Sequence, residues 1–176
     1  NFNNTVVDLE NISFEKIASE DALNIINSKF VLHNFFFKDN KSDAIDIDFA
    51  NGEIKNSFFK NIGNDAIDFS GAVAEIENVT LVNIGDKLIS IGENSNISIK
   101  KIVGSNSLIG LASKDGSNAV VEDLNFKDIQ IPFMAYNKKP TYGFGEILIN
   151  NNPKIQNFKK KWVSDKNSKI IFKKKR

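Results

Sequence analysis

The chain repeats itself every 22 residues, and this period constrains its fold more than any other feature. Residues 42–63 read SDAIDIDFANGEIKNSFFKNIG and residues 64–85 read NDAIDFSGAVAEIENVTLVNIG, so the two segments align without a gap. The period continues in two apolar columns: Ile25, Ile47, Phe69, Ile91, Leu111 and Met134, and beside them Leu23, Ile45, Ile67, Ile89 and Ile109. A fixed period of this length indicates an architecture in which each unit stacks on the next.

Within each repeat the apolar residues alternate with polar ones, as in residues 45–49 and 97–99. This is the periodicity of strands, and helical spacing is not sustained anywhere in the chain. Because short strands recur without helices between them, we predict a coiled parallel β-solenoid with one turn per repeat. The columns predict about six coils within residues 1–149, followed by a basic cap or tail at residues 150–176.

A column of asparagines has the same period: Asn11, Asn34, Asn56 and Asn78. Each precedes a strand, so we expect these side chains to point inward at a bend and to form a stacked amide ladder. Such a ladder satisfies the polar groups of a buried bend. We assign it a structural role rather than a binding role, and we expect it to end near residue 90, where the column changes to Lys101 and Asp123.

The asparagine ladder, the 22-residue coil and the aliphatic columns resemble the right-handed parallel β-helices of the pectin-lyase-like superfamily. The stretches GNDAIDFSG, LASKDGS and MAYNKKPTYGFG are similar to β-helix domains of bacterial surface proteins, some of them attached to spore-coat-H-like kinase modules. The resemblance implies a right-handed all-β fold and an extracellular or cell-surface location. The family includes many chemistries as well as purely structural proteins, so the fold alone does not specify a function.

Acidic residues occupy outward positions of three consecutive repeats. The alternation places Asp46 above Asp68 in one column, with Asp48 on the same outward face. Asp43 and Asp65 form a second column at the neighbouring turn, and Lys87 follows them. Since adjacent coils are about 4.8 Å apart, these like charges repel unless a cation or a lysine neutralises them.

Several interpretations of these carboxylates remain open. One is a calcium site, with Asp43, Asp46, Asp48, Asp65 and Asp68 as ligands, because Ca²⁺ is held by six to eight oxygens. The family resemblance adds a polysaccharide lyase or epimerase acting on uronate polymers, with Asp46, Asp68 and Lys87 as catalytic candidates and Lys114 as an alternative base. A glycosidase pair of Asp46 and Asp68 is a further alternative. In the plainest interpretation these aspartates only cap turns and face solvent.

The segment MAYNKKPTYGFG, residues 134–145, breaks the repeat and predicts an irregular loop. Tyr136, Tyr142 and Phe144 make it the best local candidate for carbohydrate contact. The alternative is a loop that covers the end of the solenoid core, because an open solenoid end exposes apolar residues and unpaired strand edges.

The net charge of +1 conceals two opposed regions. Residues 1–149 carry 13 basic and 21 acidic side chains, whereas residues 150–176 carry 10 basic side chains and one acidic one. The basic segment predicts final strands that cap the acidic body. A salt-dependent attraction to nucleic acid or to an anionic surface is the alternative, but no recognised nucleic-acid module is present.

Composition excludes several other functions. The chain has no Cys and a single His, which rules out disulfides, thiol chemistry and multi-histidine metal sites. No apolar run is long enough to span a membrane, and no signal peptide is visible. Because the sequence starts at Asn1 rather than Met, we expect a processed protein or a fragment of a longer one.

From these observations we expect a non-catalytic scaffold or binding domain of a bacterial secreted or surface protein, in contact with polysaccharide. The lyase or epimerase is the first alternative, and a structural spacer or adhesin stalk is the second. Ca²⁺ is the one cofactor that the residues suggest. Other modules of a longer parent chain are expected partners.

Overall fold

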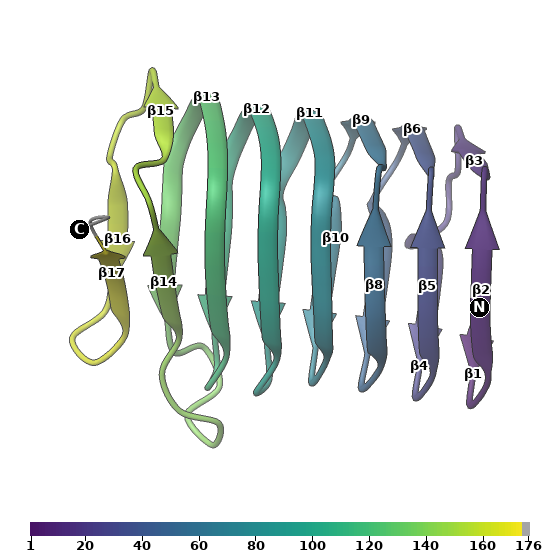
Figure 1. The fold of residues 1–176 in the computed structure, drawn as a ribbon, viewed down its shortest axis with the longest axis horizontal. Coiled ribbons are helices and arrows are strands. Elements are labelled where there is room, and N and C mark those ends of the chain that lie inside the picture. The colour runs from purple at the N-terminus through teal and green to yellow at the C-terminus, as the bar shows by residue number, and fades with distance from the viewer. Residues whose placement is uncertain (174–176) are drawn as a thin grey trace.

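The computed structural model describes residues 1–173, and the last three residues of the predicted basic tail lie outside that range. The described residues form a parallel β-solenoid, which confirms the predicted fold class and its repeat of about 22 residues. Each turn of the chain, here called a coil, lies beside the next from the purple N-terminal coil to the yellow C-terminal coil (Figure 1). Within this range no helix is long and apolar enough to cross a membrane.

Every coil has three faces. Face A carries β1 (Phe2–Asn3), β4 (Asp21–Ile26), β7 (Asp43–Asp48), β10 (Ile67–Ser70) and β16 (Trp162–Ser164). Face B carries β2 (Val6–Glu10), β5 (Lys29–His33), β8 (Asn51–Lys55), β14 (Glu146–Asn150) and β17 (Lys169–Lys173). Face C carries β3 (Ser13–Glu15), β6 (Phe36–Asn40), β9 (Phe58–Ile62) and β15 (Lys154–Gln156). Three long strands run through faces B, C and A in turn: β11 (Val73–Gly92), β12 (Asn96–Lys114) and β13 (Asn118–Tyr136).

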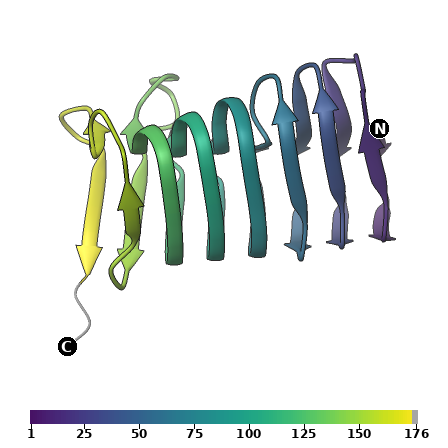
Figure 2. The ribbon, with the colours of Figure 1, turned by 90° about the horizontal axis from the view of Figure 1, so that it is seen from above.

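The long strands show how one coil becomes the next. In the view from above, the teal and green segments bend around the corners without a break (Figure 2). Their pairings are parallel throughout, and β11 pairs with β12 on all three faces. Every strand except those of the first and last coils therefore has a neighbour on both sides, which satisfies its backbone hydrogen bonds.

The solenoid has about eight coils, not the six expected from the apolar columns. The first additional coil begins with β1, where Phe2 pairs with Ile25. The other includes β16, where Val163 pairs with Met134, and β17, which pairs with β14. The basic segment therefore contributes strands to the stack, and its apolar residues are too few to have extended the columns in the sequence.

The predicted columns are correct through the first four repeats and wrong beyond them. Ile91 pairs with Ser113, not Leu111, and Leu111 pairs with Ile89 on one side and Phe133 on the other. On face A the spacing therefore stays at 22 residues, whereas between β11 and β12 it is 23 on faces B and C. The extra residue of faces B and C enters at the corner formed by Glu93 and Asn94, which both have positive φ. A register shift between Ile84 and Lys87 compensates for it before the paired strands reach face A. Because Ser113 is polar, the apolar pattern alone led to the wrong partner.

The asparagine column lies at an exposed corner and not inside the coil. Asn11, Asn34, Asn56 and Asn78 have φ between 51° and 59°, which is the left-handed conformation that asparagine tolerates better than most residues. Their amides still stack: Asn34 Nδ2 donates to Asn11 Oδ1 at 3.1 Å, and Asn78 Nδ2 donates to Asn56 Oδ1 at 2.7 Å. Two of the three steps of the expected ladder are therefore hydrogen-bonded, and the column lies at a surface turn of the chain.

The core follows from the inward side chains of the three faces. On face C, the rings of Phe14, Phe37 and Phe59 stack with centroids 5.0 and 4.9 Å apart. Buried serines satisfy the backbone at the corners, as where Ser95 Oγ accepts from Ala72 N at 2.9 Å. The interior is therefore filled by apolar ladders, and function must reside on the outer surface or at the ends.

Candidate functional site

The outward side of face A carries a groove of about 420 Å³ that runs across several coils. Asp46 on β7 and Asp68 on β10 lie opposite one another in register, as the repeat predicts, and Asp48 faces Ser70 in the same way. The groove is lined by seven carboxylate side chains and three lysines, together with Ser70: Glu20, Asp21, Asp43, Asp46, Asp48, Asp68, Glu93, Lys114, Lys138 and Lys139.

The acidic part of this groove holds its protons unusually tightly. Burial, together with the charges of Asp48 and Asp21, raises the pKa of Asp46 to about 7. Burial together with the charge of Asp43 raises the pKa of Asp21 to about 6. Both carboxyl groups therefore exchange protons near neutral pH, where they can donate as well as accept hydrogen bonds.

Asp65 and Lys87 do not line the groove, although the sequence placed them with the other candidates. Asp65 is 3% exposed, and Lys87 Nζ lies 3.2 Å from both of its carboxylate oxygens. The backbone amide of Asp65 donates to Asp43 Oδ1, and that of Lys87 donates to Asp65 Oδ1. This turn column therefore connects successive coils through hydrogen bonds.

The ion pairs of Lys87 oppose the role of a catalytic base. Burial alone would lower its pKa, but the hydrogen bonds and charges of Asp86 and Asp65 outweigh burial and raise the pKa of Lys87 above its ordinary value. A lysine that abstracts a proton near neutral pH needs the opposite shift. Lys114 does line the groove, with Nζ 2.9 Å from Ser90 Oγ and 3.8 Å from Asp68 Oδ1.

The geometry gives the calcium hypothesis no support. Among residues 1–173, no three Asp, Glu or His side chains are arranged so that they could hold one metal ion together. Asp46 and Asp68 face the same groove, but Asp65 pairs with Lys87 instead of facing it. The carboxylates thus form a row along the solenoid axis and not a shell around a point.

The loop after β13 closes one end of the groove and carries the aromatic candidates. Asp115, fully buried, accepts hydrogen bonds at 2.6 Å from the backbone amides of both Lys138 and Lys139. Tyr142 and Phe144 are exposed on this loop, whereas Tyr136 belongs to β13 and is half-buried beside Lys114. Sequence reasoning missed Asp115 as the anchor; its Asp-Gly turn was the only available signal.

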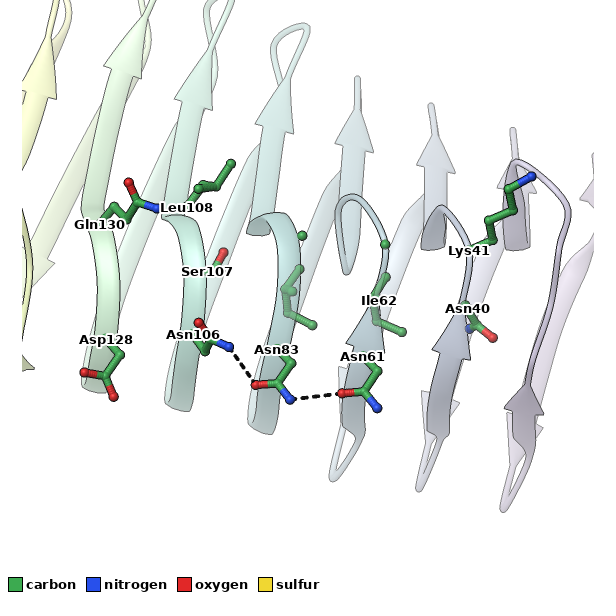
Figure 3. A pocket seen from close by; sticks show the side chains of 13 residues that line it. Asn40, Lys41, Asn61, Ile62, Asn83, Asn106, Ser107, Leu108, Asp128 and Gln130 are labelled. Atoms are coloured by element: carbon green, nitrogen blue, oxygen red, sulfur yellow. Dashed lines mark hydrogen bonds between the residues drawn. The ribbon is translucent and has the colours of Figure 1, made fainter.

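A second groove, of about 520 Å³, follows the corner between faces C and A. Its rim is an amide ladder that the sequence analysis overlooked: Asn106 Nδ2 donates to Asn83 Oδ1 and Asn83 Nδ2 to Asn61 Oδ1, both at 3.0 Å (Figure 3). The 22- and 23-residue spacing of these asparagines was the signal available. These amides bond to one another along the rim, so we assign this corner the same structural role as the first asparagine column.

Together the fold and the groove define a β-solenoid with a polar, mostly acidic surface channel parallel to its axis. No family model matches the chain, and no match was found among curated proteins or solved structures. The solenoid fold therefore rests on the structure itself, and its function must be argued from the groove.

Proposed function

We propose that this chain is a non-catalytic scaffold that binds a polysaccharide along the groove of face A. The observation that carries the proposal is the register of its polar side chains: Asp46 opposes Asp68 and Asp48 opposes Ser70. Adjacent strands are about 4.8 Å apart, so the groove offers polar groups at regular intervals. A polymer of similar sugar units laid along the axis meets equivalent contacts at successive coils.

The side chains suit sugar hydroxyl groups. An ionised carboxylate accepts hydrogen bonds with both oxygens, and a carboxyl group with a pKa of about 7, such as Asp46, also donates when protonated. The loop that contributes Lys138 and Lys139 to the groove is fixed by Asp115 and also carries Tyr142 and Phe144, which provide exposed aromatic surface. Such a site combines hydrogen bonding with apolar contact, as ligand sites usually do.

The proposal also includes the kind of organism that the protein comes from and its location at the cell surface or outside the cell. A kinship with the right-handed β-helices of the pectin-lyase-like superfamily, and a bacterial secreted or surface protein as the parent, would place the groove where polysaccharides occur. Other modules of a longer parent chain are the proposed covalent partners. The ion pairs of Lys87 keep it protonated, so Lys87 does not suit the base of a uronate lyase. Lys114, which lines the groove, is the remaining candidate base of that alternative.

Affinity electrophoresis through gels containing single polysaccharides tests the proposal. The panel includes neutral, uronate-containing and amino-sugar polymers, and we expect at least one to retard the wild-type chain. The double variant Asp46→Ala/Asp68→Ala should lose most of that retardation. Asp8→Ala/Glu75→Ala removes two exposed carboxylates from face B and should behave as wild type.

Two results would count against groove binding. Migration unchanged by every polymer would favour the spacer or adhesin stalk. Retardation that survives in the face A variant would place any polysaccharide contact elsewhere on the molecule.

A further inference from the structure

The charges of the face A groove are unevenly balanced along its length. Within residues 1–173, lysines form ion pairs with two of its seven carboxylates: Glu93 pairs with Lys139, and Asp68 Oδ1 lies 3.8 Å from Lys114 Nζ. The other five form no ion pair in that range and belong to β4, β7 and the turn before β4: Glu20, Asp21, Asp43, Asp46 and Asp48. The coils of β4 and β7 therefore present negative charge that the described protein does not offset.

Buried oxygens in the same part of the groove lack a hydrogen-bond donor. Asn24 lies on β4 in register with Asp46, between the inward Leu23 and Ile25, so its side chain is directed to the groove side of face A. Asn24 is 8% exposed, and its Nδ2 donates to Asp46 Oδ2 at 3.0 Å. Its Oδ1 is buried without a hydrogen-bond partner among the described residues, and so is Asp68 Oδ1 two coils further on. Buried acceptors are normally satisfied, so these two oxygens indicate a donor that a ligand brings.

These groups together suit a donor that carries positive charge. Burial and the neighbouring carboxylates raise the pKa of Asp46 to about 7 and that of Asp21 to about 6, so a cation beside them would be stabilised. One metal ion does not match the geometry, because no three acidic side chains of the described residues surround a point. Ammonium groups spaced along a polymer match a row of acceptors, since each carries one charge and three N–H donors.

We propose, on the basis of the polysaccharide function above, that the groove of face A selects polysaccharides with free amino groups. Their ammonium groups donate to Asn24 Oδ1 and to the carboxylates of Asp46 and Asp68, which lie in one column along the axis. A neutral or N-acetylated sugar brings donors without charge and binds less tightly. A uronate polymer adds negative charge and is repelled by the coils of β4 and β7.

Calorimetry with three oligosaccharides of equal length and linkage tests this selectivity. They are built from glucose, N-acetylglucosamine or glucosamine, so they differ only in a hydroxyl, an acetamido or an amino group at one carbon of each unit. At about pH 6.5, we expect the glucosamine oligosaccharide to bind the wild-type chain at least about tenfold more tightly than the other two, because hydrogen bonds to charged groups are the stronger ones. This advantage should shrink as the salt concentration rises from about 20 to about 300 mM, because salt screens the charges.

Variants of the groove show which groups are responsible. Asp46→Asn/Asp68→Asn keeps the shape of both side chains but removes their charge, so the affinity for the glucosamine oligosaccharide should fall to that for the N-acetylglucosamine one. Asn24→Ala removes the buried acceptor and should weaken glucosamine binding about tenfold. The control Asp8→Asn/Glu75→Asn removes the same number of exposed carboxylates from face B and should bind as wild type. Circular dichroism of each variant checks that it is folded.

The outcomes separate the selectivity from the function on which it rests. Equal affinity for the three oligosaccharides, or retardation by other polymers without binding of glucosamine, would overturn the selectivity and leave polysaccharide binding in place. A preference for glucosamine that the folded variant Asp46→Asn/Asp68→Asn retains would also overturn it, because the charges responsible would lie elsewhere. No binding of any oligosaccharide, together with no retardation by any polymer, would remove the proposed function and the selectivity with it. The comparison of the three oligosaccharides uses the wild-type chain, so it decides the matter even if a variant fails to fold.

Discussion

Lys87 Nζ lies 3.2 Å from both carboxylate oxygens of Asp65, which is placed one coil earlier at the same turn. Both side chains are largely removed from solvent, with 14% and 5% of their surfaces exposed. Burial raises the pKa of Asp65 to about 6 despite the lysine, so the pair is fully ionised only above that pH. Lys87 therefore offsets a buried carboxylate at the turn that these two coils share.

Replacing Lys87 by Met should destabilise the protein by about 2 to 4 kcal/mol at pH 8, because it leaves a buried carboxylate without its partner. The loss should shrink at pH 5, where Asp65 is protonated and needs no counter-charge. Urea unfolding at the two pH values measures both effects, with Lys60→Met on an exposed strand position as the control. An equal loss at both pH values would show that the charge of Asp65 is not the cause.

Asp46 should make the protein more stable in mild acid than at neutral pH. Its pKa is raised in the folded state, to about 7 from an ordinary 3.8, so the folded chain binds more protons than the unfolded chain between these values. The resulting stability is fully present below pH 4 and is lost as the pH rises through 7.

Asp46→Asn removes the cost of holding an ionised carboxylate in the groove. It should therefore raise the melting temperature at pH 8 by a few degrees and leave it nearly unchanged at pH 4.5. Thermal unfolding followed by circular dichroism measures this difference, and Asp8→Asn on an exposed strand position is the control. A lower melting temperature of Asp46→Asn at pH 8 would show instead that contacts in the groove stabilise the ionised carboxylate of Asp46.

Asp115 should control access to the loop that carries Tyr142 and Phe144. Asp115→Gly keeps the left-handed conformation (φ 55°) but removes the oxygen that accepts from Lys138 N and Lys139 N. Brief trypsin treatment should then cleave after Lys138 much faster than in the wild type, because Pro140 prevents cleavage after Lys139.

The control is Asn94→Gly, which changes a left-handed residue at the same corner one coil earlier. Mass spectrometry of the fragments identifies the cut. Equal cleavage rates in the wild type and Asp115→Gly would mean that the loop is held by other contacts.

The sequence was sufficient for the fold and for part of the site because both depend on the period. A 22-residue repeat without a gap puts Asp46 beside Asp68, and the structure shows that register. The coil count could not be obtained in this way, since β1 and β16 contain too few aliphatic residues to extend the columns. The partner of Ile91 was also hidden, because Ser113 is polar and does not extend the apolar column.

Three features of the structure depend on chain geometry that the repeat does not encode. Whether a corner asparagine such as Asn56 points inward is decided by its left-handed backbone, which turns the side chain to the surface. The contact between Asp115 and the amide of Lys138 depends on the path of a loop that interrupts the period. For the same reason Asp65 was grouped with the groove residues, although its turn directs it toward Lys87.

The most direct test of the proposed function is the affinity of the chain for oligosaccharides of increasing length, cut from whichever polysaccharide retards it. If the polysaccharide binds along the groove, the affinity of the chain for the oligosaccharide, measured by calorimetry, should rise with each added sugar. It should level off once the oligosaccharide spans the coils from Asp21 to Lys139. Asp46→Ala/Asp68→Ala should remove the rise. An affinity independent of length, or a rise that the double variant retains, would contradict a polysaccharide bound along the groove of face A.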